Sequence, residues 1–600
     1  MSKILDEKMA KMSKEESELW ALRHTAEHVL HTAMQNLYPQ LKKAMGPATA
    51  EGFYFDFDLD QKVNVEDFPK IEKEMQRLID ADYPMVQEYI TPAQAKKIFK
   101  NNPYKMDWVE QIEKRGEKVS VYKMGDMDLD LCSGPHAKST DEIKAFKLLS
   151  IAGAYWHGDE KNKMLTRIYG TCFPNKEELE KHLQFLADSE RKDHRRIGKD
   201  LDLFVFSDLV GQGLPLFTPK GATIRRLLER FVQDEEIKRG YLHVVTPPLA
   251  KVALYKTSGH YPYYKDTMYP LMKVDEDELI LRPMTCPHHF MLYKSRPRSY
   301  KELPIRFGEL SPQFRYEKSG ELSGLLRVRM FCLADAHIFA QKEQAEQVIN
   351  EVLDLIEYVN GVLGFKKGED LRYRLSLGDR KDSKKYYKDD VAWDYAESVL
   401  RNVLKQRKDP YFEAPNEAAF YGPKIDVQLK NAHGREETAF TVQYDFVMPK
   451  RFELKYIDNN GKEIQPIVIH RSSIGAIERT MAFLIEKYEG AFPTWLAPVQ
   501  VQIIPIADRH LDYARKIRDR LAQDNIRVEI DDRAEKMQAK IRDAQNQKVP
   551  YMLIMGDREE KENKVAVRVR NKGDIGQLDT QEFVDKIVKE IDSKSLELFS

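Results

Sequence analysis

Three residues that lie far apart in the sequence, Cys286, His337 and His470, constrain the fold of this chain more than any other feature. One thiolate and two imidazoles are a normal ligand set for zinc, with the fourth coordination position left open for a substrate. A chain that uses them together has to bring three distant segments to one place. Taken singly, Cys286 would more often be a buried thiol and each histidine a core or surface residue, so the prediction rests on all three.

Composition indicates a large protein with packed cores in a reducing compartment. The 600 residues suggest three or four domains, at about 150 residues each. Four cysteines without close pairs argue against a disulfide framework. The charged N-terminus lacks an apolar signal core, and there is no apolar run long enough to span a bilayer, so we expect a cytoplasmic protein with no membrane partner. The net charge of -1 neither favours nor excludes RNA binding.

Changes of texture along the chain predict a multidomain α+β protein with three domains. Residues 1–192 mix helix-like and short strand-like stretches and end in a charged helical connector, which runs from Asn175 to about Arg196. Residues 193–495 alternate strands with long helices. Residues 496–600 predict a small α/β domain with a mostly parallel sheet. Its expected strands are VQVQIIPIA, RVEIDD, YMLIMG and KVAVRVR.

Three passages of the middle segment carry a family resemblance. The first is YLHVVTPP at 241–248, after an amphipathic helix around 225–239. The second is PIRFGELSPQFRYE at 304–317 with RVRMFCLADAH at 327–337, and the third is GAIER at 475–479. In order, they resemble the three signature motifs of class II aminoacyl-tRNA synthetases. The resemblance implies an antiparallel-sheet catalytic domain, ATP with Mg²⁺ as cofactor, and a homodimer through the first passage; we find no Walker A or Rossmann glycine pattern.

The resemblance assigns the charged residues of these motifs to ATP. Arg315 matches the arginine that stabilises the α-phosphate charge as pyrophosphate leaves, and Glu317 matches the residue on the adenine side. Arg479 matches the arginine that contacts the γ-phosphate. Strand alternation predicts Arg315 and Glu317 on one face of a strand, and Asp335 and His337 on one face of its partner. Taken alone, Arg315 and Glu317 would more often be an exposed cross-strand pair.

The zinc ligands together with the synthetase motifs favour threonine as the amino acid. Threonine can fill the open zinc position with its amino group and its hydroxyl, whereas valine lacks the hydroxyl; a polar contact of this kind discriminates about 10⁴-fold. In the family, the other residues around the amino acid match Asp335, Tyr421, Lys424 and Gln443. The chain departs from many relatives at Leu333 and Thr438, where they carry glutamine, which puts the fine contacts to substrate in doubt.

The N-terminal segment contains candidates for a second active site. Serine also carries a hydroxyl, so a zinc site cannot reject it strongly, and hydrolysis of the mischarged product is the expected remedy. An H-x₃-H pattern with a C-x₃-H pattern resembles the editing domain of threonyl- and alanyl-tRNA synthetases. The residues that match it are His24, His28, Lys105, Asp130, Cys132 and His136. By ligand type the set can hold a second zinc, or it can orient a water without metal; the threonyl resemblance favours the metal-free site.

The C-terminal segment, from about 497 to 600, resembles the anticodon-binding domain of class IIa synthetases. Glu559 and Arg568 match positions that read anticodon bases. A few residues suffice for this, because unpaired loop bases are read by stacking and edge hydrogen bonds. We therefore expect tRNA(Thr) as the nucleic-acid partner.

The whole resemblance covers about residues 20–590 and implies a threonine–tRNA ligase with one zinc per subunit, acting on L-threonine, ATP and tRNA(Thr). The small ubiquitin-like domain that precedes the editing domain in most bacterial relatives is expected to be absent. Two alternatives remain open. A prolyl- or seryl-type ligase would not need the three zinc ligands together, and a non-catalytic RNA-binding regulator would not need both Arg315 and Arg479.

Overall fold

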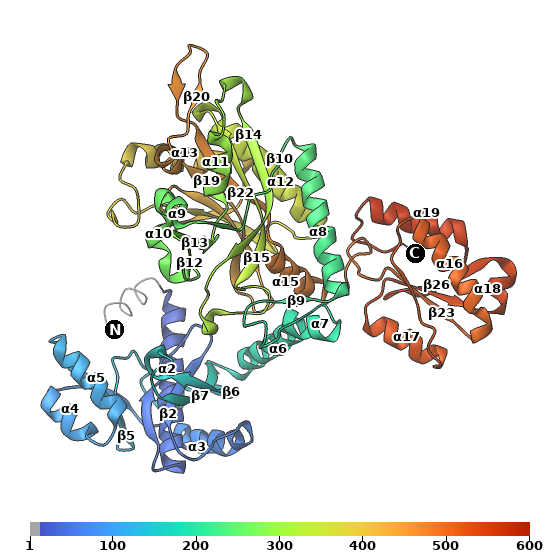
Figure 1. The fold of residues 1–600 in the computed structure, drawn as a ribbon. Coiled ribbons are helices and arrows are strands. Elements are labelled where there is room, and N and C mark those ends of the chain that lie inside the picture. The colour runs from blue at the N-terminus through green and yellow to red at the C-terminus, as the bar shows by residue number, and fades with distance from the viewer. Residues whose placement is uncertain (1–11, 600) are drawn as a thin grey trace. The chain divides into compact units, whose positions relative to one another are not determined.

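The computed structural model describes residues 12–599, and contacts divide the chain into two compact units between Ala187 and Asp188. The first unit carries two small antiparallel sheets, and the second carries an eight-stranded and a five-stranded sheet among its larger sheets. Figure 1 labels the helices and strands. The multidomain α+β fold class predicted from the sequence is confirmed.

The larger sheet of the first unit is antiparallel, in the order β1–β2–β7–β6. On β2, Phe53, Phe55 and Phe57 alternate into the core, as expected for a strand with one buried face. Helix α2 packs on this sheet and begins at a capping box formed by Ser13 and Glu16. The bounds are α2 (Lys14–Leu37), β1 (Lys42–Met45), β2 (Phe53–Asp58), α3 (Phe68–Asp80), β6 (Ala145–Tyr155) and β7 (Met164–Phe173).

A three-stranded antiparallel sheet and two short helices complete the first unit. The side chain of Asn102 accepts hydrogen bonds from the backbone N–H groups of Tyr104 and Lys105, which fixes the start of the helix that carries Lys105. The bounds are β3 (Met85–Ile90), α4 (Pro92–Phe99), α5 (Pro103–Lys114), β4 (Val119–Met124) and β5 (Asp128–Leu131).

The eight-stranded sheet of the second unit has the order β10–β14–β15–β22–β19–β18–β16–β17. It is antiparallel except at its two ends, where β10 runs parallel to β14 and β17 runs parallel to β16. The bounds are β10 (Leu242–His243), β14 (Ile305–Phe314), β15 (Met330–Ala340), β16 (Leu371–Ser376), β17 (Tyr411–Ala414), β18 (Lys424–Lys430), β19 (Glu436–Asp445) and β22 (Ile467–Ala476).

Alternation along these strands gives the large sheet two different faces. On β15, Ala334, Ala336 and Ile338 pack into a core that includes helices, while Asp335 and His337 point to the opposite face. The apolar face is covered because amphipathic helices bury their own apolar stripes against it. Those helices are α8 (Pro219–Lys238), α12 (Ala345–Val362), α13 (Asp390–Arg407) and α15 (Ile477–Tyr488).

The C-terminal sheet has the order β24–β23–β25–β26–β27 and is mixed. The expected parallel arrangement holds for β24, β23 and β25, but β26 and β27 pair antiparallel. The connection from Val569 to Gly573 is too short for a parallel crossover, so these two strands form a hairpin. The bounds are β23 (Val501–Pro505), α16 (Leu511–Gln523), β24 (Val528–Ile530), α17 (Met537–Asn546), β25 (Tyr551–Met555), α18 (Asp557–Glu562), β26 (Lys564–Val569), β27 (Gly573–Asp579) and α19 (Thr580–Asp592).

The charged connector forms two helices instead of one. Asp193 separates them, because its side chain accepts a hydrogen bond from Arg195 N at 2.7 Å and thereby caps the second helix. The two helices are α6 (Lys176–Lys192) and α7 (His194–Asp200). Short elements fill the second unit, namely β8 (Phe204–Val205), β9 (Leu216–Phe217), β11 (Leu249–Lys251), α9 (Val252–Ser258), α10 (His260–Tyr263), β12 (Met272–Val274), β13 (Asp277–Leu281), α11 (Cys286–Lys294), α14 (Met448–Arg451), β20 (Tyr456–Ile457) and β21 (Glu463–Ile464).

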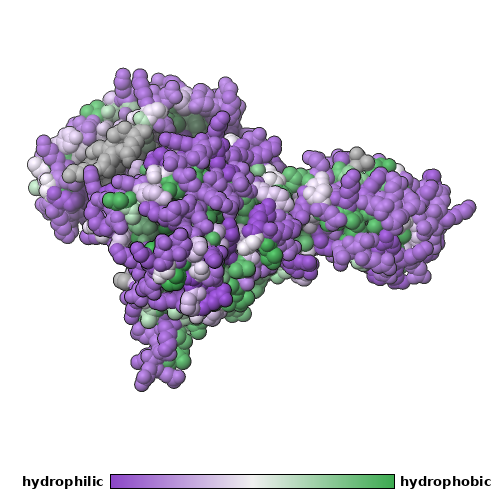
Figure 2. All heavy atoms as spheres, turned by 90° about the horizontal axis from the view of Figure 1, so that it is seen from above, coloured by the Kyte–Doolittle hydropathy of each residue, from purple (hydrophilic) through white to green (hydrophobic). Residues whose placement is uncertain are grey.

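Charged and polar side chains dominate the face seen in Figure 2, with smaller hydrophobic areas between them. No helix among residues 12–599 is both long and apolar enough to cross a membrane. The four cysteines of the chain are all free thiols.

Candidate active site

A cavity of about 650 Å³ opens over the polar face of the eight-stranded sheet. Helices cover the other face of the sheet, so the polar side chains that alternation turns away from the core gather here. All the residues predicted for the metal, ATP and amino-acid sites line this one cavity. They are Cys286, Arg315, Glu317, Asp335, His337, Tyr421, Lys424, Gln443, His470 and Arg479.

Three elements bring Cys286, His337 and His470 together. Cys286 is the first residue of α11, and His337 is paired with His470 across the neighbouring strands β15 and β22. One ligand atom from each residue lies within 4.8 Å of the other two, and all three side chains are buried. A sulfur and two imidazole nitrogens therefore converge on one point.

Burial sets the protonation of these groups. It raises the pKa of the Cys286 thiol well above its ordinary value, and the nearby carboxylates of Asp335 and Asp445 raise it further. Burial also lowers the pKa of His337 well below its ordinary value. The imidazole is thus already in the neutral form that binds metal, whereas the thiol has to lose its proton when a metal binds.

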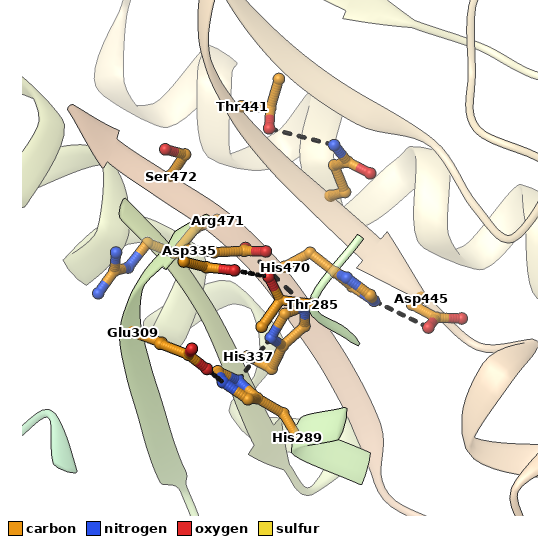
Figure 3. Close-up of polar contacts among 12 residues, drawn as sticks. Thr285, His289, Glu309, Asp335, His337, Thr441, Asp445, His470, Arg471 and Ser472 are labelled. Atoms are coloured by element: carbon orange, nitrogen blue, oxygen red, sulfur yellow. Dashed lines mark hydrogen bonds and ion pairs between the residues drawn. The ribbon is translucent and has the colours of Figure 1, made fainter. Parts of the chain in front are cut away.

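Two further side chains contact ring nitrogens of the two histidines, and a third side chain contacts one of those two, as Figure 3 shows. His470 Nε2 lies 2.9 Å from Asp445 Oδ2. His337 Nδ1 lies 2.8 Å from His289 Nδ1, and His289 Nε2 lies 3.2 Å from Glu309 Oε2. Sequence reasoning missed these partners. They leave His337 Nε2, which lies 3.9 Å from Asp335 Oδ1, and His470 Nδ1 as the nitrogens that can bind an ion.

Polar groups that suit a small ligand surround the cysteine–histidine set. The Tyr421 ring stacks on the His470 ring, with centroids 5.0 Å apart, and Tyr421 Oη donates to Gln443 Oε1 at 2.5 Å. Gln313 Nε2 donates to Asp335 Oδ2 at 3.3 Å, and burial raises the pKa of Asp335. A carboxyl group, a phenol and two amides therefore converge beside the metal-capable set.

The segment from Tyr421 to Lys424 lies very close to strand β19. A Cβ at Gly422 would lie 1.8 Å from the carbonyl oxygen of Tyr444, so only glycine fits there. Lys424 Nζ donates to both carboxylate oxygens of Asp426 at 2.8 Å. The close approach of Gly422 thus fixes where Tyr421 and Lys424 enter the cavity.

Arg315 and Glu317 follow strand β14 and are not part of it, so the prediction that both lie on a strand was wrong. Arg315 N still donates to Arg329 O at 3.0 Å, but Glu317 N turns back to Arg315 O at 2.9 Å, and this tight turn ends the strand at Phe314. Both side chains nevertheless line the cavity. The Arg315 guanidinium lies over the Phe331 ring, 5.1 Å from its centroid.

Arg479 and Glu317 are held by other groups at the wall of the cavity. Arg479 Nε donates to Leu326 O at 3.0 Å, and its Nη1 donates to Thr438 O at 2.6 Å. Glu317 Oε2 accepts a hydrogen bond from Arg327 Nη2 at 2.7 Å. Thr438, one of the departures from the family pattern, thus contributes its backbone carbonyl, and the other departure, Leu333, lines the cavity with an apolar side chain.

A second cluster of histidine and cysteine lies in the first unit. His24 and His28 come from α2, while Cys132 and His136 follow β5. One ligand-type atom from each lies within 4.8 Å of the others. Cys132 Sγ lies 3.4 Å from His24 Nε2 and 3.1 Å from His136 Nε2. Cys132 therefore contacts two of the three histidines of the cluster directly.

Lys105 and Asp130 form a buried ion pair beside this cluster, with Lys105 Nζ 2.7 Å from Asp130 Oδ2. Burial lowers the pKa of His24 to about 4. It also lowers the pKa values of His28 and His136 well below the ordinary value. The three imidazoles are therefore neutral near pH 7 and can accept a proton from a water molecule or orient it.

Sequence reasoning missed a buried charged network next to the second cluster. His31 Nε2 lies 2.7 Å from Asp128 Oδ2, and Lys43 Nζ lies 2.6 Å from Asp128 Oδ1. His31 Nδ1 also faces Glu27 Oε1 at 3.3 Å. The spacing of three between His28 and His31 on one helix was a signal for this neighbour.

The two residues predicted to read the anticodon lie in the C-terminal part of the second unit. Glu559, on α18, is buried, and its carboxylate accepts a hydrogen bond from Gly556 N at 3.0 Å. Arg568 lies on β26, opposite Met552 of β25. No hydrogen bond or ion pair joins Glu559 to Arg568 within residues 12–599. A buried Glu559 is not presented to a base in this conformation.

Family models match three stretches of the chain. They are the "Threonyl and Alanyl tRNA synthetase second additional domain" at 119–169, the "tRNA synthetase class II core domain (G, H, P, S and T)" at 269–488, and the "Anticodon binding domain" at 500–590. The core match contains the cysteine–histidine set and the predicted ATP residues. The first match contains Asp130, Cys132 and His136 but begins after His24 and His28.

Similar proteins cover nearly the whole chain. A threonine–tRNA ligase of Staphylococcus carnosus is 50% identical over 575 residues, which make up 96% of this chain and 88% of that protein. A protein of the same name from Anoxybacillus flavithermus is 48% identical over 573 residues, 95% of this chain and 88% of its own length. Among solved structures, the RNA binding domain of threonyl-tRNA synthetase from Cryptosporidium parvum is 33% identical with a TM-score of 0.63, covering 68% of this chain and 99% of its own.

Proposed function

The chain belongs to the threonine–tRNA ligase family, and on that premise we propose that it selects threonine with a zinc ion and joins it to tRNA(Thr). It is an aminoacyl-tRNA synthetase with a class II core, which uses ATP and Mg²⁺. The observation that carries the proposal is one cavity in which Cys286, His337 and His470 lie beside Asp335 and two arginines. The relatives do not favour a prolyl- or seryl-type ligase or a non-catalytic regulator.

The donor set fits zinc. Tetrahedral zinc with Zn–S of about 2.3 Å and Zn–N of about 2.0–2.1 Å has ligand atoms about 3.5 Å apart, and the three donors here lie within 4.8 Å of one another. Cys286 Sγ, His337 Nε2 and His470 Nδ1 would hold the ion, one per subunit, because the other ring nitrogens face His289 and Asp445. When bound, zinc supplies a Lewis-acidic position for the amino group and hydroxyl of threonine.

The chain's own polar groups complete the recognition of threonine. Asp335 accepts the substrate hydroxyl, because its carboxyl group lies buried at the wall of the cavity. Tyr421 and Gln443, already joined by a hydrogen bond, close over the substrate, and Lys424 borders the same space. Valine would leave these buried groups unpaired, which discriminates about 10⁴-fold. Serine also carries the hydroxyl, so these groups do not discriminate strongly against it.

Activation places negative charge near two arginines. The carboxylate oxygen of threonine forms a bond to the α-phosphorus, and the bond to pyrophosphate breaks. Arg315 stabilises the charge on the α-phosphate, and Arg479 holds the γ-phosphate. Glu317 meets the adenine side. Their support is that all three line one cavity with the amino-acid residues, and that Arg479 is fixed by two backbone carbonyls.

The cluster in the first unit hydrolyses seryl-tRNA(Thr) without a metal. Water adds to the ester carbonyl, the bond to the tRNA 3′ oxygen breaks, and that oxygen takes a proton. His24, His28 and His136 orient the water, with Cys132 between two of them. Lys105, held by Asp130, binds the substrate. The contacts of Cys132 Sγ with His24 Nε2 and His136 Nε2 support the metal-free form, because these atoms already contact one another.

The remaining assignments follow the same family pattern. Residues 1–192 form the editing domain with its connecting helix, 193–495 the catalytic domain, and 496–600 the anticodon-binding domain, where Arg568 and Glu559 contact anticodon bases. For Glu559 this requires that the buried carboxylate be released when tRNA binds. Free cysteines fit a protein of a reducing compartment such as the cytoplasm.

The enzyme acts as a homodimer through the first signature passage. Apolar side chains are exposed along helix α8 and the strand that follows it, where Ile237 is 57%, Leu242 58% and Val245 93% exposed. Exposed apolar side chains so close together in the sequence mark an interaction surface. A second copy of the chain with the same surface would bury them.

Amino-acid-dependent exchange between ATP and pyrophosphate tests the proposed function. We expect exchange with threonine, weaker exchange with serine, and none with valine or proline. Cys286→Ser should lose both zinc and exchange, whereas Cys172→Ser, at a buried thiol of the first unit, should keep both. Exchange with proline, or full exchange in a zinc-free Cys286→Ser enzyme, would contradict the proposal.

A further inference from the structure

A chain of hydrogen bonds leads from the metal-capable set to Glu309 on strand β14. It starts at His337 Nδ1, 2.8 Å from His289 Nδ1, and continues from His289 Nε2 to Glu309 Oε2 at 3.2 Å. The rings of His337 and His289 stand nearly perpendicular, at 89°. All three side chains are at most 4% exposed, and Figure 3 shows His289 between Glu309 and His337. The catalytic roles proposed above do not use His289 or Glu309.

The direction of this chain follows from Glu309. Although burial raises the pKa of Glu309, hydrogen bonds from His289 and Thr246 and the charge of Arg282 lower it overall, so the group is an ionised acceptor. His289 Nε2 therefore carries the proton and donates. When His337 binds a metal through Nε2, its one ring proton lies on Nδ1, which then donates to His289 Nδ1 at 2.8 Å. His337 Nε2 is left without a proton and points its lone pair outward, as a metal ligand must.

Glu309 is itself fixed by two residues from other segments. Thr246 Oγ1 donates to Glu309 Oε2 at 2.7 Å, and Arg282 Nη2 donates to Glu309 Oε1 at 3.0 Å. Arg282 Nη1 also donates to Thr246 Oγ1 at 2.6 Å. Thr246 directly follows Val245, one of the most exposed apolar residues of the described chain. The hydrogen-bond chain thus joins the metal-capable histidine to the surface passage 241–248.

We infer that His289 and Glu309 are positioning residues, which fix the tautomer and ring orientation of His337 for zinc and fasten it to passage 241–248. This inference deepens the proposed zinc site and rests on it. Partners of this kind typically change metal affinity about 10–100-fold when they are removed. Neither residue is among those that line the cavity, so their effect should be on metal retention first.

Two substitutions of His289 separate orientation from mere packing. His289→Leu removes the acceptor for His337, and we expect zinc affinity of the full-length enzyme, measured by competition with a chelator, to fall about 10–100-fold. His289→Asn places an amide oxygen where Nδ1 was, so it should restore most of the affinity. His288→Leu is the matched control, because both ring nitrogens of His288 are buried without a hydrogen-bond partner in the described structure. It should bind zinc as the wild type does.

The surface end of the chain is tested at Thr246. Thr246→Val removes the hydroxyl that donates to Glu309, whereas Thr246→Ser keeps it. We expect faster zinc release from the valine variant and unchanged release from the serine variant. The ligand-field spectrum of the Co²⁺-loaded enzyme should change with His289→Leu and return with His289→Asn, a response that a packing defect would not give.

The outcomes distinguish the two levels of the proposal. If the wild type binds no zinc, or if Cys286→Ser keeps it, the proposed metal site fails. If the wild type binds zinc through Cys286 but His289→Leu binds it equally well, only the positioning role fails. If His289→Asn is as impaired as His289→Leu, or if neither folds while His288→Leu does, His289 serves packing and the inference is overturned.

Discussion

A single substitution at Asp335 can distinguish recognition of threonine from binding of zinc. Its carboxyl group lies in the cavity and accepts a hydrogen bond from Gln313 Nε2 at 3.3 Å. Asp335→Asn keeps the volume but removes the charge. A hydrogen bond to a charged group contributes about 1.5–3 kcal/mol, so kcat/KM for threonine in the exchange reaction should fall about 10–100-fold. Zinc content should stay the same, and a parallel loss of zinc would assign Asp335 to the metal instead.

The two cysteine–histidine sets predict different metal contents. We expect one zinc per chain in the wild type, none in Cys286→Ser, and one in Cys132→Ser, because the cluster around Cys132 is proposed to work without metal. Elemental analysis of the purified enzymes measures this directly. Two zinc ions in the wild type, one of them lost with Cys132, would show that the editing cluster is a metal site.

The sequence predicted the residues of the site better than the residues that hold them in place. Cys286, His337 and His470 could be found because their side-chain chemistry is unusual in combination. Asp445 could not, because an aspartate at the end of a strand is common and only the pairing of β19 with β22 brings it to His470. His289 left a weak signal, since it stands three residues after Cys286 on a helix.

At the scale of elements, the approach of the 421–424 segment to β19 determines the shape of the amino-acid pocket. Gly422→Ala would place a methyl group 1.8 Å from the carbonyl oxygen of Tyr444, so the segment has to move. A displacement of about 1 Å can reduce catalysis about 10²-fold. We expect a fall of that order in threonine-dependent exchange.

Gly361→Ala, on helix α12, is the matched control for this change. A Cβ there meets nothing within 4 Å, and alanine favours a helix more than glycine does. Its exchange rate should equal that of the wild type, and its melting temperature should be the same or higher. Equal activity of Gly422→Ala would mean that the segment is not needed for catalysis in its present position.

The sequence predicted helices and strands correctly where their local pattern was strong. It missed their ends where a single hydrogen bond determines the end. The helix periodicity of 175–196 was correct, but the side chain of Asp193 caps a new helix and divides the run. Alternation placed Asp335 and His337 correctly on one face. It failed for Arg315, because a hydrogen bond from Glu317 N to Arg315 O ends the strand, and alternation carries no information about where a strand ends.

At the scale of the whole molecule, buried neutral histidines make stability depend on pH. Burial lowers the pKa of His24 to about 4 and that of His260 to about 3. Unfolded histidines have pKa values of about 6.5. Between these values the unfolded chain binds protons that the folded chain does not, so the stability is complete above pH 6.5 and is lost as the pH falls toward 4.

Melting temperatures between pH 7.5 and 5 test this dependence. They should fall with pH in the wild type, and less steeply in His24→Asn, which keeps a donor for Pro135 O but cannot titrate. The pKa of the buried His31 is raised overall despite its burial, so this group works against the trend. A melting temperature that does not change over this range would contradict the buried neutral state.

Assembly of the molecule is tested at its exposed apolar passage. Val245 is 93% exposed, and a carboxylate at this position would have to be buried without a partner in a dimer. Val245→Asp should therefore sediment as a monomer at concentrations where the wild type sediments as a dimer. Val391→Asp, at an 81% exposed valine on α13, should leave the dimer intact. A dimeric Val245→Asp enzyme would place the interface elsewhere.

The four free thiols have a consequence for how the molecule responds to its surroundings. Burial raises the pKa of Cys172 and of Cys332 to about 12, so neither forms the reactive thiolate near neutral pH. An alkylating reagent can therefore reach them only when the chain around them opens. The rate of Cys172 alkylation therefore reports how often the first unit opens. The rate of Cys332 alkylation reports how often the large sheet opens. Both can be followed by mass spectrometry in the native enzyme, without any engineered probe.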